Sequence, residues 1–144
     1  MQQLVLRASG LFIWAATACR FIREGNRRFA LKRLDTILKG SISNITAPEK
    51  QLDEIYTKVL KHSISLNATE EEQEELSQGL RHVLGSVVIL LSPLSSHSLG
   101  RLLRLPEGDV DQTLEELHTI LHIPEEPSRL IRLHHPLFRD FLLN

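Results

Sequence analysis

Hydrophobic residues recur at helical spacing along most of this chain. An apolar run over residues 3–24 predicts a first helix that is apolar on most faces, enclosed by its neighbours and capped by Gly25-Asn26. Leucines three and four residues apart predict a second, short helix over residues 28–38. Proline suits the first turn of a helix, so Pro48 marks the start of a third. The apolar stripe of this third helix consists of Leu52, Ile55, Tyr56, Val59 and Leu60.

The second half of the chain begins with a long helix and continues with shorter elements. Thr69 and Glu72 have the spacing of a capping box, which predicts the start of the long helix. Ser95-Ser96 can cap a short helix. After a turn, Asp109 starts another helix, whose apolar positions continue to Leu121.

Two short β-type stretches follow, 121–123 and 130–133, and a turn rich in proline and glutamate joins them. The order helix, turn, helix, hairpin is that of a winged-helix unit. The fold class that we expect is mainly α. A helical domain over residues 1–66 precedes a winged-helix domain over residues 67–144, which includes its leading helix and a small two-stranded wing.

Composition and charge narrow the classes of partner. The chain is 42% hydrophobic and 24% charged, as in an ordinary globular protein. A formal net charge of -1 favours neither nucleic acid nor an anionic membrane as a partner. An aromatic content of 5% disfavours a stacking platform for single-stranded nucleic acid.

The N-terminal apolar run invites a membrane interpretation, but its charges oppose it. Arg7, Arg20 and Arg23 leave far fewer than the roughly 20 apolar residues that a spanning helix needs. The single cysteine, Cys19, excludes an internal disulfide, and its apolar neighbours predict a buried thiol in a reducing compartment, the cytoplasm. Helical periodicity is already running at Leu4, so we expect a piece of a longer protein.

The predicted winged helix raises the question of DNA binding. The second helix of the pair would enter the major groove. Its surface carries no lysine or arginine between Asp109 and Leu121, so it would meet phosphates with like charge. We therefore rank DNA binding low. The exposed positions that we expect on this helix and the turn before it include Glu107, Asp109, Asp111, Gln112, Glu115 and Glu116.

Catalytic and metal motifs give no support for an enzyme. His118 and His122 are four residues apart, but no Asp, Glu or Cys stands at a spacing typical of a zinc site, so we predict no metal. The chain has neither a Gly-x-Ser-x-Gly nucleophile elbow nor a Walker motif. We expect it not to be an enzyme by itself.

The junction near the C-terminus offers the best candidate site. If residues 130–135 alternate as a strand, Ile131, Leu133 and His135 share one face. Pro136 suits the first helical position, which would make His135 the N-cap of the last helix. A helix start offers free N–H groups that stabilise anions, phosphates above all. Two interpretations stay open for His135, a phosphate-facing imidazole and a partly buried, hydrogen-bonded packing residue.

Four segments in this order resemble one family. They are residues 10–22, 52–56, 84–90 and 133–142, and the last is similar to an ending Leu-His-Pro-Ser-Phe-Arg-Asp-Phe-Leu. The resemblance is to fungal NACHT proteins of the STAND class of NTPases. These relatives of NOD-like receptors often carry WD repeats and take part in signalling such as heterokaryon incompatibility. It covers nearly the whole chain, and Leu137 departs from it where the family usually has serine.

The resemblance implies a helical and winged-helix arm that closes over the nucleotide held by the NACHT core. A family pattern His-x-x-Phe-x-x-Phe, whose histidine touches the β-phosphate of ADP, falls here on His135, Phe138 and Phe141. Pro136, Arg139 and Asp140 complete the motif. The implied partners are the NACHT core of the same parent chain and further copies on activation, with no nucleic acid or membrane. No cofactor belongs to this segment, whereas ADP or ATP with Mg would bind the parent. The alternatives are a winged-helix protein–protein module without a nucleotide and, ranked lower, a DNA-binding winged helix.

Overall fold

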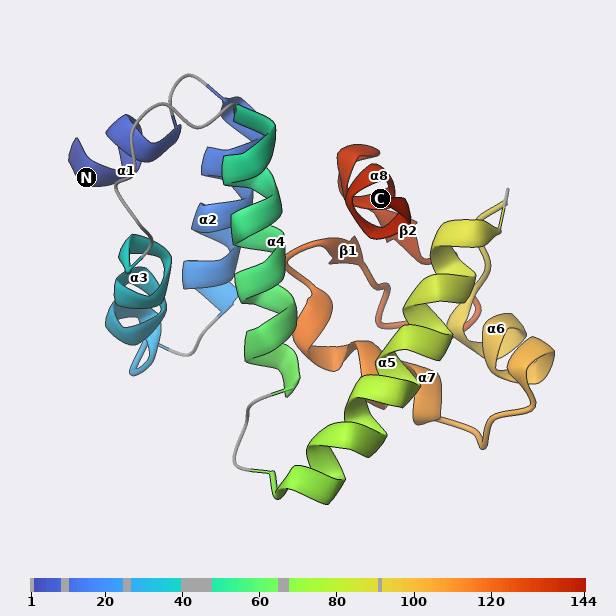
Figure 1. Cartoon of the computed structure of the whole chain (residues 1–144). Helices are drawn as coiled ribbons and strands as arrows, with labels where there is room; N and C mark the ends of the chain where they lie inside the picture. Colours follow the sequence, from blue (N-terminus) through green and yellow to red (C-terminus); the bar gives the residue numbers. More distant parts are fainter. Residues whose placement is uncertain (1, 9–10, 25–26, 40–47, 65–67, 91) are drawn as a thin grey trace. The chain divides into compact units, whose positions relative to one another are not determined.

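The computed structural model describes residues 2–8, 11–24, 27–39, 48–64, 68–90 and 92–144 (Figure 1). Over these residues the chain is mainly helical with one small antiparallel sheet, as the sequence predicts in these coarse terms. It divides into two compact units, residues 1–61 and 62–144. The expected C-cap at Gly25-Asn26 lies outside the described residues.

The described residues of the N-terminal unit form four helices, and the prediction of a single helix over residues 3–24 is wrong. One helix ends at Ala8 and the next begins at Phe12, and the Leu11 N–H donates to the Ala8 carbonyl at 2.6 Å. The sequence gives a reason, because Gly10 is a poor helix former. The helices are α1 (Gln2–Ala8), α2 (Phe12–Glu24), α3 (Ala30–Leu38) and α4 (Pro48–Ile64), and α4 begins at the predicted proline.

Helix α2 buries one face only, so the expectation of a helix without a free face is also wrong. Phe12 is 84% exposed, and the Cys19 thiol is exposed instead of buried. Each residue turns a helix by about 100°, so Cys19 points away from the face that its neighbour Ala18 buries. The buried residues of α2 are Trp14, Thr17, Ala18 and Phe21.

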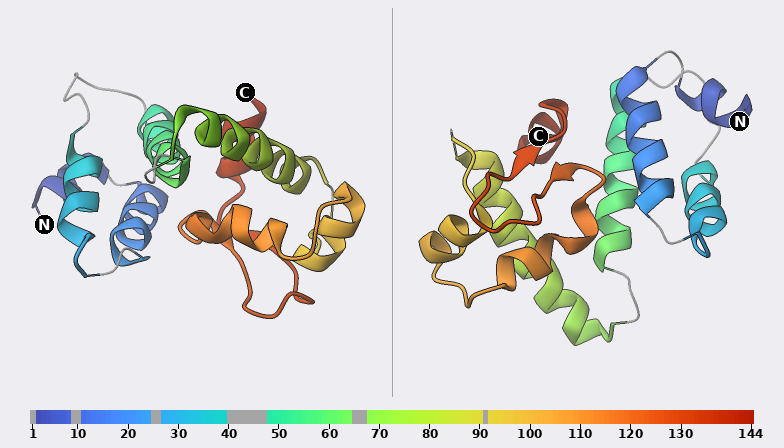
Figure 2. Two further views of the ribbon diagram at one scale, coloured as in Figure 1. Left: turned by 90° about the horizontal axis from the view of Figure 1, so that it is seen from below. Right: turned by 180° about the vertical axis from the view of Figure 1, so that it is seen from behind.

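Side-chain hydrogen bonds connect α3 to α2 and to α4. The Arg33 guanidinium donates to the Phe21 carbonyl at 2.9 Å and lies 4.9 Å from the centre of the Phe21 ring. The Lys58 ammonium donates to the Ile37 carbonyl at 3.1 Å. Helix α4 lies along α2 in Figure 1 and in the right-hand view of Figure 2. Four members of its predicted stripe are buried, namely Leu52, Ile55, Tyr56 and Val59.

The C-terminal unit follows the predicted order of elements (Figure 2). Thr69 and Glu72 form the predicted capping box, with Thr69 N–H to Glu72 Oε2 at 2.7 Å and Glu72 N–H to Thr69 Oγ1 at 3.3 Å. Ser95 caps the next helix by accepting the Ser98 N–H at 3.2 Å. The elements are α5 (Glu70–Ile89), α6 (Ser96–Leu103), α7 (Asp109–Leu114), the 3-10 turn η1 (Glu115–Leu117), β1 (Leu121–His122), β2 (Arg132–Leu133) and α8 (Leu137–Leu143).

The hairpin and the last helix complete the core of this unit. β1 pairs with β2 in antiparallel register, Leu121 opposite Leu133. Helix α5 contacts both α7 and α8. Phe138 is 1% exposed, whereas Phe141 is only partly buried. The buried core comprises Leu80, Val83, Leu84, Val88, Leu99, Val110, Leu114, Leu117, Ile120, Leu121, Ile131 and Phe138.

Candidate functional site

The candidate site lies where β2 leads into α8. Helix α8 begins at Leu137, and Pro136 is its N-cap with φ -58° and ψ -32°. The prediction that His135 is the N-cap is therefore wrong by one residue. The reason is that the Pro136 carbonyl, which receives the Asp140 N–H at 3.4 Å, accepts the first intrahelical bond.

The N–H groups at the start of α8 are occupied by the chain itself. Leu137 N–H donates to the His135 Nδ1 atom at 3.2 Å, and Phe138 N–H donates to the His135 carbonyl at 3.2 Å. Arg139 N–H donates to the Pro136 carbonyl at 2.9 Å. The expectation that this helix start offers free N–H groups to an anion is therefore wrong. A local ring-to-backbone bond has taken one of them.

The imidazole of His135 is left with one donor. Because Nδ1 accepts a hydrogen bond, the neutral ring carries its proton on Nε2. Among the residues that the structure describes, this Nε2–H has no acceptor, and the side chain is partly exposed. His135 can therefore donate one hydrogen bond to a group from outside the described chain.

His134 has a different environment, although it is the neighbouring residue. Its Nε2 atom lies 3.0 Å from the His118 carbonyl, and its backbone N–H donates to the Ile120 carbonyl at 3.1 Å. Its ring meets the His122 ring edge-on with 6.2 Å between centroids. These contacts connect the residue after β2 to the turn before β1, so His134 stabilises the hairpin.

The remaining residues of the motif are distributed over different surroundings. Phe138 lies in the core and stacks on Phe141, with ring centroids 6.1 Å apart and 23° between planes. Arg139 is partly buried and lines a cavity to which His135 does not contribute. Asp140 is exposed. The structure thus brings the two aromatic rings together but not the motif's charged groups.

Charge is divided unevenly along the chain, a signal that net charge alone conceals. Residues 1–61 contain 11 Lys and Arg against 5 Asp and Glu. Residues 62–144 contain 6 Lys and Arg against 13 Asp and Glu. Helix α7, the helix that would enter the major groove in the low-ranked DNA-binding alternative, lies in this acidic unit and has two aspartates in its first turn. Counting charge separately for each half would have found this pattern from the sequence.

Tyr56 is a buried titratable side chain whose pKa shifts strongly. It is 2% exposed, and burial raises the pKa of its hydroxyl to about 12. The carboxylate of Asp53 raises the pKa further, and the Arg20 guanidinium opposes it. Tyr56 is therefore a neutral core residue at physiological pH.

Two further features are absent from the part of the chain that the structure describes. No group of three or more His, Cys, Asp or Glu side chains is placed to hold a metal ion. No described helix combines the length and the apolar composition that crossing a bilayer requires.

Comparisons with protein-family models, with curated proteins and with solved structures found no match to this chain.

Proposed function

We propose that this chain is the regulatory arm of a nucleotide-dependent switch of the fungal NACHT type. In this proposal a helical region and a winged-helix domain close over ADP held by the NTPase core of the parent protein. The arm is not catalytic by itself. The observation that carries the proposal is the imidazole of His135, whose Nδ1 is engaged by Leu137 N–H and whose Nε2–H is available.

Backbone pairing between the segment before α6 and the segment before β2 supports the winged-helix part of the proposal. Ser95 forms an antiparallel bridge with Leu130, and Ile131 N–H donates to the Leu94 carbonyl at 2.8 Å. The segment that leads into α6 is thereby joined to the second arm of the hairpin. Helix pair and hairpin then form one unit, which is the arrangement expected of a wing packed beside its helices.

In the resting state, the His135 Nε2–H would donate to a phosphate oxygen of ADP. A hydrogen bond to a charged group contributes about 1.5–3 kcal/mol, which corresponds to roughly tenfold to 150-fold in affinity. Because the bond would exist only in the closed form, ADP would shift the population toward that form. Exchange for ATP would release the arm. The core would supply the other phosphate contacts and hold Mg, since this chain has no Walker motif.

The departure at Leu137 makes the proposal specific. Serine at this position would add a hydroxyl beside the phosphate, whereas the leucine side chain, 36% exposed, adds none. Of residues 135–137, His135 would then be the one with a polar side chain to offer the phosphate. Its removal should therefore weaken ADP retention.

The test is His135→Ala in the full-length parent protein. We expect ADP to dissociate roughly tenfold to 150-fold faster, with higher basal signalling. His82→Ala, an exposed histidine on α5, is the matched control. His134 is unsuitable as a control because its ring contacts the His118 carbonyl. An unchanged ADP dissociation rate in a variant that melts like the wild type would refute the proposal.

A protein–protein module without a nucleotide is the second candidate, and exposed apolar side chains favour it. In the N-terminal unit, Val5, Leu6, Phe12 and Leu31 are between 71% and 84% exposed. Contiguous exposed apolar surface is typical of contact sites, and Val5 and Phe12 line one apolar pocket. If this candidate holds, Phe12→Ser with Leu31→Ser should abolish partner binding in the parent, and His135→Ala should leave both binding and ADP dissociation unchanged.

A further inference from the structure

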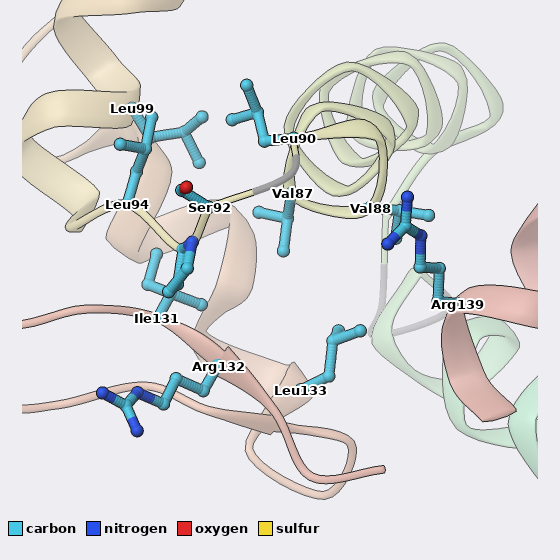
Figure 3. Close-up of a pocket in the computed structure, with 11 residues that line it drawn as sticks. Val87, Val88, Leu90, Ser92, Leu94, Leu99, Ile131, Arg132, Leu133 and Arg139 are labelled. Carbon is cyan, nitrogen blue, oxygen red and sulfur yellow. The ribbon is translucent and has the colours of Figure 1, made fainter. Parts of the chain in front are cut away.

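We propose that a cavity in the C-terminal unit binds a carboxylate carried on a short apolar chain, with Arg139 as the residue that pairs with the carboxylate. The cavity has a volume of about 230 Å³. It lies between the end of α5, the segment that leads into α6, strand β2 and helix α8 (Figure 3). His135 does not line it, so this inference is independent of the nucleotide proposal.

Most of the residues that line the cavity are apolar. Val88, Leu99 and Ile131 are each at most 2% exposed, and their side chains form part of the lining. Val87, Leu90, Pro93, Leu94 and Leu133 also belong to the apolar lining (Figure 3). Such walls favour a hydrocarbon group, because each buried methylene raises affinity by about fourfold.

The volume sets the size of the ligand. Sites for drug-sized molecules occupy about 300–1,000 Å³, so this cavity suits a smaller molecule. It exceeds by several times the roughly 30 Å³ that one water molecule occupies in the liquid. A chain of a few carbon atoms fits these limits.

Arg139 supplies the charge. It projects from α8, its guanidinium lies next to Val88 in Figure 3, and Arg139 is one of the residues that line the cavity. The side chain is partly buried, and among the described residues it has neither an ion pair nor a side-chain hydrogen bond. A partly buried guanidinium without an acceptor favours binding of an anion. Its planar fork matches a carboxylate, which can accept two parallel hydrogen bonds.

Two observations specify a singly charged ligand. Arg132 also borders the cavity, but its side chain is exposed and its guanidinium points away from Leu133 in Figure 3. Within the lining, Arg139 is therefore the one arginine that is partly buried. The unit carries 13 acidic residues against 6 basic ones, so a polyanion would be repelled. No acidic side chain lines the cavity itself among the described residues.

The carboxylate could be that of a free short-chain acid or the C-terminus of a peptide that ends in an apolar residue. Both present the same chemistry, an anion at one end of an apolar group. The experiment therefore includes both sources. The probes are hexanoate, its neutral counterpart hexanol, acetate, an acetylated Gly-Gly-Leu peptide with a free carboxylate, and the same peptide as an amide.

The whole chain, labelled with ¹⁵N, is titrated with each probe and followed by NMR. We expect hexanoate to shift the amide signals of Val88, Ile131 and Arg139, and to bind at least tenfold more tightly than hexanol or acetate. Arg139→Gln should remove this preference for hexanoate over hexanol and leave hexanol binding unchanged. Arg101→Gln, an exposed arginine on α6, is the matched control and should bind as the wild type does.

Binding of the peptide acid but not its amide would identify a peptide C-terminus as the source, and binding of hexanoate without the peptide would identify a free acid. Equal affinity for hexanoate and hexanol in the wild-type chain would overturn the proposal without any variant. So would failure of both carboxylates to bind, or hexanoate binding that Arg139→Gln leaves unchanged.

Discussion

Truncation of Phe138 to alanine tests how α8 is held in the C-terminal unit. This helix has seven residues, too few to be stable alone in water. Its anchor is Phe138, which is 1% exposed, while its stacking partner Phe141 is partly buried. We therefore expect a large loss of stability for Phe138→Ala and a smaller one for Phe141→Ala.

The magnitude follows from burial. Removing a fully buried phenylalanine costs about 3–5 kcal/mol. The whole free energy of unfolding of a unit spanning residues 62–144 is about 4–12 kcal/mol. Phe138→Ala should therefore remove a quarter of this stability at the least and can unfold the unit. Phe141→Ala should cost roughly 1–2 kcal/mol, because part of its ring already contacts water. The coupling between the two rings should be about 0.5–1.5 kcal/mol in a double-mutant cycle.

Native-state hydrogen exchange combined with urea unfolding measures these differences. Amides of α5 and α8 should lose protection in Phe138→Ala, because these two helices contact each other. Phe138→Leu, which keeps most of the buried volume, should retain most of the protection and is the control. Equal losses for Phe138→Ala and Phe141→Ala, or a loss below about 1 kcal/mol for both, would refute the assignment of Phe138 as the anchor.

Three more predictions concern the two units. Tyr56 is the only tyrosine, and its folded pKa of about 12 lies above the ordinary value of 10.0, so its contribution to stability is complete below about pH 10 and is lost as the pH rises through 12. Ultraviolet titration measures this, and ionisation at the ordinary pH in a chain that is still folded would contradict it. Thr69→Ala should cost about 0.5–2 kcal/mol in urea unfolding. NMR titration should show that the pKa of Glu72 rises only in part, because the backbone N–H of residue 69, the main cause of its lowering, remains and only the side-chain bond is lost. Gly108→Ala should lower the free energy of unfolding by about 1–2 kcal/mol, because the φ of Gly108 is +88°. Gly79→Ala in α5, where a Cβ would meet open space, should raise it by about 0.5–1 kcal/mol. A change of the same sign for both variants in urea unfolding would contradict the backbone argument.

Helix starts were predictable because their chemistry is local. Thr69 with Glu72, Ser95 and Pro48 each mark an observed helix start, since a cap needs only residues a few positions apart. Burial was predicted less well. Leu31 belongs to the leucine pattern that predicts the second helix, yet it is 79% exposed, while Ile37 is 1% exposed. Periodicity gives the existence of an apolar face but not which residues a neighbouring helix covers.

The candidate site could also be predicted from the sequence only in part. The sequence correctly places a helix after Pro136, but it could not reveal that the ring of His135 bonds to the Leu137 N–H and so removes a donor. That bond depends on a side-chain rotamer. The cavity beside Arg139 was equally inaccessible to sequence reasoning, because its walls come from segments up to about 50 positions apart. Only the folded chain brings them together.

The unequal division of charge has a practical consequence for handling the protein. A chain with a formal charge of -1 would ordinarily be expected to bind weakly to any ion-exchange resin. Here the first 61 residues should be retained by a cation exchanger and residues 62–144 by an anion exchanger, so each resin meets an oppositely charged region of the same molecule. At low ionic strength, where the Debye length reaches about 30 Å, basic regions of one molecule should attract acidic regions of another. The protein should consequently precipitate on dialysis into water and redissolve in moderate salt, which is salting-in behaviour.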